Sequence, residues 1–146
     1  MNESPSKSTF FSGLDLGSRQ DYSALVLTEK IIHNAKSEYL VRAIHRWPLR
    51  TSYPKIVEDV VHLFRRPPIQ DSTLCIDATG VGRAVGDMVR RSGVNAKMIP
   101  ITITAGHQMT RINGEYHVPK KDLVGVLQVL LSSRRLHVAK SLPEAK

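Results

Sequence analysis

The feature that most constrains the fold is a change of hydrophobic pattern near Pro54. Before it lie three apolar segments separated by polar turns, residues 10–17, 22–32 and 38–47, and each is typical of a strand. Because tight turns join neighbouring antiparallel strands, these segments predict a three-stranded meander. After Pro54 the apolar residues recur at helical spacing, and helices and strands then alternate along the chain.

The second half predicts helix 53–65, strand 72–78, helix 81–91, strand 96–104 and a helix from Pro119 onward. Residues 105–117 are expected to form a polar loop, and residues 136–139 a last short extended piece. The last helix carries a strong apolar stripe: Leu123, Val126, Leu127, Leu130 and Leu131. The order β-β-β-α-β-α-β-α predicts an α/β fold with a mixed five-stranded sheet flanked by helices. We expect the fourth strand to lie beside the first, where the strand order switches and open α/β sheets place their sites.

The length of 146 residues fits one domain, and we assign residues 1–9 to a flexible leader and residues 10–146 to the folded domain. The leader is polar and lacks the apolar core of a secretory signal, and no run approaches the ~20 apolar residues of a membrane span. The lone Cys75 excludes an internal disulfide and a zinc site built from cysteines. We therefore expect a reducing, cytoplasmic setting and no membrane partner.

Three carboxylates stand in apolar surroundings, where acids are unusual. Asp15 lies inside the first strand, Asp77 ends the fourth, and Asp122 lies in the first turn of the last helix. A buried carboxylate is costly unless it is paired or bound to a metal, and two of them on neighbouring strands repel each other without a cation between them. Oxygen ligands favour Mg²⁺ or Mn²⁺. The three acids therefore predict a divalent metal site.

Each of these acids also has a purely structural interpretation. Asp15 is followed by Gly17 and can begin a turn, Asp77 can bond the Gly-rich turn after it, and Asp122 can satisfy a helix N-terminus. We favour the metal site because one site explains all three positions. Asp21, which closes the turn after the first strand, is a weaker fourth candidate.

The remaining acids are interpreted as turn or solvated-face residues: Glu29, Glu38, Glu58, Asp59, Asp71, Asp87, Glu115 and Glu144. The six histidines show no ligand spacing and are interpreted as surface or structural residues. Of these, His107 and His117 lie in the predicted loop, from which they can approach a substrate.

The chain carries 21 Lys and Arg against 13 Asp and Glu, and this net charge of +8 suggests a polyanionic partner, most often nucleic acid. The basic residues come partly in pairs at expected helix ends, where they also complement the helix dipole. The Gly-rich turn over residues 79–82 can cradle a phosphate, but it lacks the spacing of the P-loop and dinucleotide fingerprints. Arg83, just inside the next helix, is a candidate contact for a DNA phosphate, with plain surface exposure as the equal alternative.

Three segments resemble the C-terminal nuclease domain of phage large terminase subunits: GLDLGSRQDYSALVL, LCIDATGVGRAVGDMVRRSG and VPKKDLVGVLQVLLSSRRLHVAKSLPEA. The resemblance covers residues 10–145 and implies a ribonuclease H-like fold. DATGVGRAV and the helix VPKKDLVGVLQVLL are fairly specific, whereas the first-strand Asp motif is shared by the whole superfamily.

The resemblance implies that Asp15, Asp77 and Asp122 are catalytic metal ligands, with Asp21 matching a further acidic position of some members. Asp15 would bridge two Mg²⁺ or Mn²⁺ ions ~3.5–4 Å apart, one activating water and one stabilising the leaving oxygen. The implied activity is cleavage of double-stranded DNA during viral genome packaging, in the host cytoplasm. The implied partners are that DNA, a terminase ATPase domain and other packaging proteins. Candidate contacts to the DNA backbone are Arg19, Arg83, Lys120 and Lys121.

The sequence departs from full large terminase subunits in two ways. It has no Walker-type loop, and it stops at LPEAK where relatives usually continue into another helix, so we expect an excised nuclease domain or a stand-alone remnant. There are three rival interpretations. One is a junction resolvase of the same superfamily, and another is a non-catalytic DNA-binding module. The third, a sugar-kinase or actin-like nucleotide binder suggested by the DLGS turn, needs two duplicated domains, for which 146 residues are too few.

Overall fold

The computed structural model describes residues 7–142. Its elements in chain order are β1 (Lys7–Asp15), β2 (Ala24–His33), β3 (Lys36–Arg46), α1 (Tyr53–Leu63), β4 (Thr73–Asp77), α2 (Gly82–Arg91), β5 (Lys97–Thr104), β6 (Thr110–Ile112), β7 (Glu115–Pro119), α3 (Lys120–Ser132) and β8 (Leu136–Val138). None of the helices in this part of the chain has the length and apolar character needed to cross a membrane.

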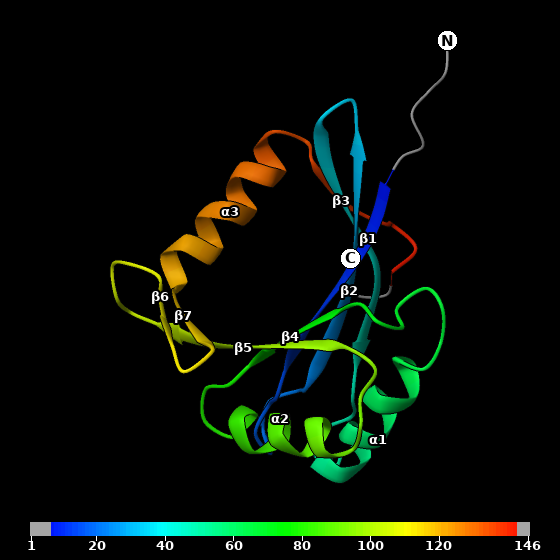
Figure 1. Ribbon diagram of the computed structural model, residues 1–146, viewed down its shortest axis with the longest axis vertical. Helices are drawn as coiled ribbons and strands as arrows, with labels where there is room; N and C mark the ends of the chain where they lie inside the picture. The colour runs from blue at the N-terminus through cyan, green and yellow to red at the C-terminus, as the bar shows by residue number, and fades with distance from the viewer. Residues whose placement is uncertain (1–6, 143–146) are drawn as a thin grey trace.

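One mixed sheet of eight strands organises the molecule, in the order β6-β7-β5-β4-β1-β2-β3-β8 (Figure 1). Strands β1, β2 and β3 form the predicted antiparallel meander. Strand β4 runs parallel to β1 on its other side, and β5 runs parallel to β4. The predicted α/β class and the position of the fourth strand beside the first are confirmed. The strand order therefore switches between β1 and β4.

Helices α1 and α2 cover one face of this sheet (Figure 1). Side chains alternate along a strand, so Leu14 of β1 and Ile76 of β4, each 2% exposed, point toward these helices. Phe64, directly after α1, and Val89 of α2 are fully buried against them. Residues one position away, Asp15 and Asp77, consequently point to the opposite face, which we call the open face.

Helix α1 begins where the sequence predicts it. The Ser52 side chain accepts a hydrogen bond from the backbone N–H of Lys55 at 3.4 Å, and Pro54 occupies the first turn. Both are favoured at helix starts, because the cap satisfies an orphan donor and proline lacks one. The apolar positions Ile56 and Val60 then face the sheet.

The sheet has eight strands where the sequence predicted five. Strands β6 and β7 form a hairpin where the sequence predicted a polar loop. β7 continues past that loop to Pro119, which the prediction placed at the start of the last helix. β8 corresponds to the short extended piece over residues 136–139. The hairpin turns at Asn113 and Gly114, whose φ values of 51° and 83° suit the tight turn that this residue pair favours. Strand β1 begins at Lys7, so it takes in three residues that the prediction assigned to the leader.

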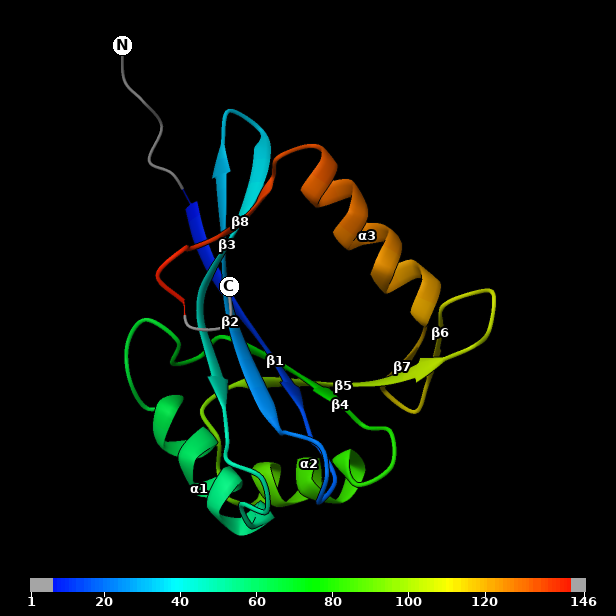
Figure 2. The ribbon, with the colours of Figure 1, turned by 180° about the vertical axis from the view of Figure 1, so that it is seen from behind.

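Helix α3 is not packed as its apolar pattern predicts. It runs from β7 near one edge of the sheet to β8 at the other edge, on the side away from α1 and α2 (Figure 2). None of its residues is buried. Its exposed apolar side chains lie between 44% and 60% exposed: Val124, Val126, Leu127, Val129 and Leu131. A helix that is apolar all round is normally buried, so α3 stands out from the rest of the fold.

Candidate active site

The strand register brings Asp15 and Asp77 together. The last paired positions of the parallel strands β1 and β4 are Leu14 and Ile76. Asp15 and Asp77 follow them directly, at the carboxyl ends of adjacent strands and on the same face. This is the edge at which open α/β sheets place their sites.

The environment of Asp15 disfavours its charged form. Partial desolvation at the strand end, together with repulsion from Asp77 and more weakly from Asp21, raises the pKa of Asp15 above its ordinary value. A divalent cation between the carboxylates would remove this repulsion, and carboxylate oxygens are the ligands that hard cations prefer. The donor set of Asp15 and Asp77 therefore fits a divalent ion.

Asp77 is held in place by the turn that follows β4. Its Oδ1 accepts a hydrogen bond from the backbone N–H of Thr79 at 2.8 Å, as the structural interpretation of this residue predicts. The hydrogen bonds within residues 7–142 leave its other carboxylate oxygen free. Gly82 lets helix α2 start against the Asp77 backbone, because a Cβ there would overlap the Asp77 carbonyl oxygen and lie 2.9 Å from its carbon. One oxygen thus anchors the side chain while the other remains available to a ligand.

The loop after β1 fixes Asp21 beside this pair. Asp21 Oδ2 accepts a hydrogen bond from the Ser18 hydroxyl at 3.0 Å, and Gly17 donates its N–H to Ser23 Oγ, also at 3.0 Å. The Tyr53 hydroxyl donates to the Gly17 carbonyl at 3.1 Å, which ties the loop to α1. A Cβ on Gly17 would lie only 2.6 Å from the backbone carbon of Asp21, so the close turn requires glycine.

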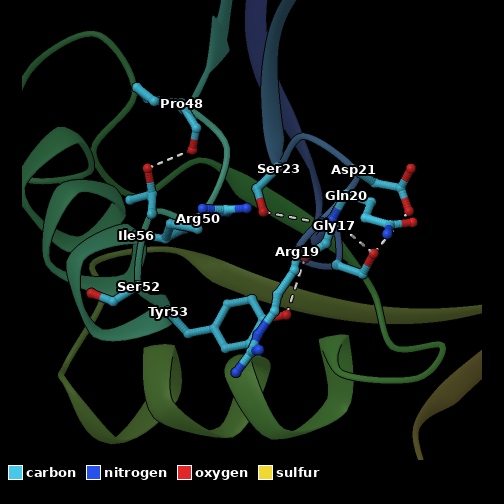
Figure 3. A pocket seen from close by; sticks show the side chains of 12 residues that line it. Gly17, Arg19, Gln20, Asp21, Ser23, Pro48, Arg50, Ser52, Tyr53 and Ile56 are labelled. Carbon is cyan, nitrogen blue, oxygen red and sulfur yellow. Dashed lines mark hydrogen bonds between the residues drawn. The ribbon is translucent and has the colours of Figure 1, made fainter.

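A pocket of about 760 Å³ lies between this loop and the start of α1 (Figure 3). Arg19 of the loop and Arg50 of the segment before α1 both line it. No ion pair within residues 7–142 involves either guanidinium. Asp21 lines the same pocket, so the two arginines give it a positive balance that suits a polyanionic ligand. The sequence offered no signal for the part played by Arg50.

Asp122 lies apart from the other acids. It sits on α3 at a pocket of about 650 Å³, which is also lined by Tyr39 of β3 and by Val126 and Val129 of α3. Asp77 and Asp21 are the carboxylates whose charges act on Asp15, and Asp122 is not among them. Within residues 7–142, no group of three or more His, Cys, Asp or Glu side chains is close enough to hold one metal ion. In this conformation the structure joins two of the three predicted ligands.

Arg83, a predicted DNA contact, is engaged in an ion pair. Its two terminal nitrogens donate to the carboxylate of Glu115 at 2.5 and 2.9 Å, and Thr102 also donates its hydroxyl to that carboxylate. These donors hold the pKa of Glu115 below its ordinary value. The interpretation of Glu115 as a solvated-face residue was wrong: it is 8% exposed, because β7 pairs with β5 and turns it toward α2. The Asn113-Gly114 hairpin signal would have placed it on a strand.

The other candidate contacts lie around the start of α3. Lys120 and Lys121 are exposed in its first turn, and Lys121 Nζ lies 3.4 Å from Nδ1 of His107. His117 Nε2 lies 3.8 Å from the Glu115 carboxylate, so this histidine is a neighbour of the Arg83–Glu115 ion pair. Glu144 lies outside the described residues. The two lysines directly precede Asp122 and place positive charge at the start of α3.

Comparison with known proteins identifies the fold. No protein-family model matches the sequence, and no curated protein matches it at the level of sequence. Among solved structures, the chain is similar to the P22 large terminase nuclease domain, with a TM-score of 0.63 at 10% identity over 97% of this chain. The fold is that of large terminase nuclease domains.

Two further structures agree. The large terminase nuclease from thermophilic phage G20c with bound zinc gives a TM-score of 0.57 at 17% identity over 92% of this chain. The manganese-soaked human cytomegalovirus terminase nuclease domain gives 0.53 at 12% identity over 92% of this chain. The chain spans 66%, 65% and 63% of the length of these three structures. The ribonuclease H-like class that the sequence resemblance implied is therefore confirmed as a fold.

Proposed function

We propose that this chain is a terminase-type endonuclease domain that cleaves double-stranded DNA with the help of divalent cations. The observation that carries the proposal is the Asp15–Asp77 pair at the strand-order switch of a terminase nuclease fold. The raised pKa of Asp15 supports it, since a bound cation would offset both of its causes, first the desolvation of the carboxylate and then the repulsion from Asp77. The relatives solved with zinc or manganese support a divalent ion.

Asp15 and Asp77 would hold Mg²⁺ or Mn²⁺, with Asp21 close by and Asp122 as the third ligand that the resemblance implies. When bound, two such ions supply an activated water and stabilise the leaving oxygen of a phosphodiester. The chain's own contribution is positional: the Thr79 N–H orients Asp77, and the Gly17 turn orients Asp21. A fixed carboxylate pair needs no reorganisation at the moment of reaction.

The DNA would be held by its phosphates. Arg19 and Arg50 line the pocket that Asp21 also lines, and Lys120 and Lys121 directly precede Asp122. Arg83 contributes less, since Glu115 already neutralises it. Contacts of this kind position the backbone and carry little sequence information. We propose genome packaging as the setting, with a separate terminase ATPase and other packaging proteins as partners, on the basis of the fold alone.

The test is nicking of supercoiled plasmid with Mg²⁺ or Mn²⁺. Asp77→Asn should lower the rate at least ~100-fold, the loss expected when about 3 kcal/mol of transition-state stabilisation is removed. Asp71→Asn is the matched control: Asp71 is exposed in a turn at φ 60°, where asparagine is equally at ease, and its rate should not change. Equal rates for wild type and Asp77→Asn would refute the assignment.

The same preparation separates the rivals. A clear preference for four-way junctions over plasmid duplex would instead identify a junction resolvase on the same fold. DNA binding without cleavage and without stabilisation by Mg²⁺ would identify a non-catalytic DNA-binding module.

A further inference from the structure

Another pocket, of about 470 Å³, lies between α1 and the antiparallel strands of the meander. Both views show α1 beside β3, on the side of the sheet away from α3 (Figures 1 and 2). The apolar lining comes from the sheet, from α1 and from the segment after α1: Leu25, Leu27, Ala43, Leu63 and Ile69. Sites for small molecules typically measure about 300–1,000 Å³, so this pocket has the size of one. We call it the meander pocket.

The strand register forms the floor of the meander pocket. Ser12 of β1 pairs with Leu27 of β2, which in turn pairs with Ala43 of β3. Ser12 lies two positions before Leu14, so alternation along β1 turns both side chains toward the helices. Because the side chain of Ala43 is short, the end of this row leaves space beside α1.

Ser12 is the polar side chain of this floor, and its hydroxyl has no partner. The residue is 2% exposed, and no hydrogen bond within residues 7–142 reaches its Oγ. A buried hydroxyl without a partner is costly. A bound water would need two or more polar partners to be held there, whereas the side chains next to Ser12, those of Leu25 and Leu27, are apolar. A ligand with one hydrogen-bonding group would satisfy this hydroxyl.

Two polar side chains at the mouth of the pocket already have partners. The carboxylate of Asp59 accepts from Trp47 Nε1 at 3.0 Å and from Lys55 Nζ at 2.8 Å. His62 Nε2 lies 2.7 Å from a terminal nitrogen of Arg66 and accepts from it, because a guanidinium can only donate. Since the charge of Asp59 is offset by Lys55, the mouth favours an uncharged ligand.

We propose that the meander pocket binds a small, uncharged aromatic molecule whose hydroxyl or N–H group forms a hydrogen bond with Ser12. The apolar body of the ligand would be removed from water against Leu27 and Leu63, which favours binding. His45 stands at the mouth with its ring edge-on to Trp47 at 4.5 Å, and such rings suit an aromatic neighbour. The proposal goes beyond the nuclease assignment, since no residue of this pocket belongs to the proposed metal site or DNA contacts.

The probes are p-cresol and toluene, which differ by one hydroxyl. Each would be titrated at millimolar concentration into ¹⁵N-labelled protein and followed by NMR. The indole N–H of Trp47, the lone tryptophan, reports binding because it donates to Asp59 at the mouth. We expect saturable shifts of this signal with both probes. Ser12→Ala should weaken p-cresol binding about 5-fold, as for the loss of one hydrogen bond, and toluene binding by less than about 2-fold.

Ser72→Ala is the matched control. In the described part of the chain the Ser72 hydroxyl is also buried and unpartnered, but Ser72 does not line the meander pocket. Both alanine variants should raise the Tm of the free protein, because each removes a buried hydroxyl without a partner. Only Ser12→Ala should weaken p-cresol binding. If wild type, Ser12→Ala and Ser72→Ala bind p-cresol equally, no hydrogen bond to Ser12 forms and the proposal is wrong.

A second variant tests the location. Ala43 is exposed at the pocket, so Ala43→Phe should fill it without disturbing the core and abolish the binding of both probes. Binding that survives this change would place the probes elsewhere and overturn the proposal, as would the absence of saturable shifts in the wild type. Tighter binding of N-acetyltyrosinamide than of p-cresol would assign the pocket to a side chain of a partner protein instead. None of these measurements involves Mg²⁺ or DNA, so a failed nicking assay leaves this proposal standing.

Discussion

Gly82→Ala should separate the contribution of close backbone packing from that of helix propensity. An added Cβ would overlap the carbonyl oxygen of Asp77 and lie 2.9 Å from its carbon. Both atoms are backbone, so no side chain can rotate away, and the start of α2 would have to move by about 1 Å or more. Overpacking of this kind costs about 3 kcal/mol, at the upper end of its usual range. For a chain of this size that is a loss of roughly 6–12 °C in Tm.

The assay is thermal unfolding of Gly82→Ala beside Gly86→Ala, a matched change four residues further along α2. At Gly86 the added Cβ meets only the Ile76 side chain, with Cδ1 at 3.4 Å, which can yield slightly. Alanine also favours the helix by about 1 kcal/mol, so Gly86→Ala should be near neutral. Gly82→Ala should in addition lose the Tm rise on addition of Mg²⁺, because it displaces Asp77. Equal Tm values for the two variants would refute the packing argument.

Two further predictions concern charge. Asp15→Asn should raise the Tm of the metal-free protein by a few degrees at neutral pH and abolish the Tm rise with Mg²⁺. Because the pKa of Asp15 is higher in the folded than in the unfolded state, the protein loses stability as the pH rises from the unfolded-state pKa through the folded-state pKa. Asparagine has no such ionisation and avoids this loss. A lower Tm for Asp15→Asn in scans without metal would contradict the prediction. The two arginines should differ. Arg83→Gln should lower the midpoint of urea unfolding, because it removes the ion pair with Glu115. Arg19→Gln should keep its stability and bind DNA more weakly, with a smaller salt dependence. Because the pKa of Glu115 is lowered in the folded state, the ionised carboxylate stabilises the wild type above pH 4.5, and this stabilisation is lost as the pH falls through the folded-state pKa. Arg83→Gln should lack this stabilisation. If the Tm of wild type and of Arg83→Gln fell equally with acid, the ion pair would not be its source.

The order of helices and strands followed from local patterns. The meander, α1 and the strand that ends in Asp77 were all predicted correctly, since hydrophobic periodicity depends on residues close together in the chain. The β6–β7 hairpin was missed because its strands are short and polar, although the Asn113-Gly114 pair marks its turn.

The partners of individual side chains did not follow from local patterns. Glu115 has the composition of a surface residue, and only the pairing of β7 with β5 turns it toward Arg83. Arg50 joins Arg19 at one pocket because the loop after β1 and the segment before α1 meet in space. Such contacts join residues far apart in the chain, and local periodicity carries no information about them.

The sequence by itself determined that acids would stand at the ends of the first and fourth strands and on the last helix, because each lies in an apolar pattern of recognisable period. The tertiary structure decided which of them meet. Parallel pairing of β1 with β4 places Asp15 beside Asp77, whereas the position of α3 holds Asp122 apart. An apolar stripe indicates that one side of a helix favours burial, but the surface that covers this side is formed by residues elsewhere in the chain.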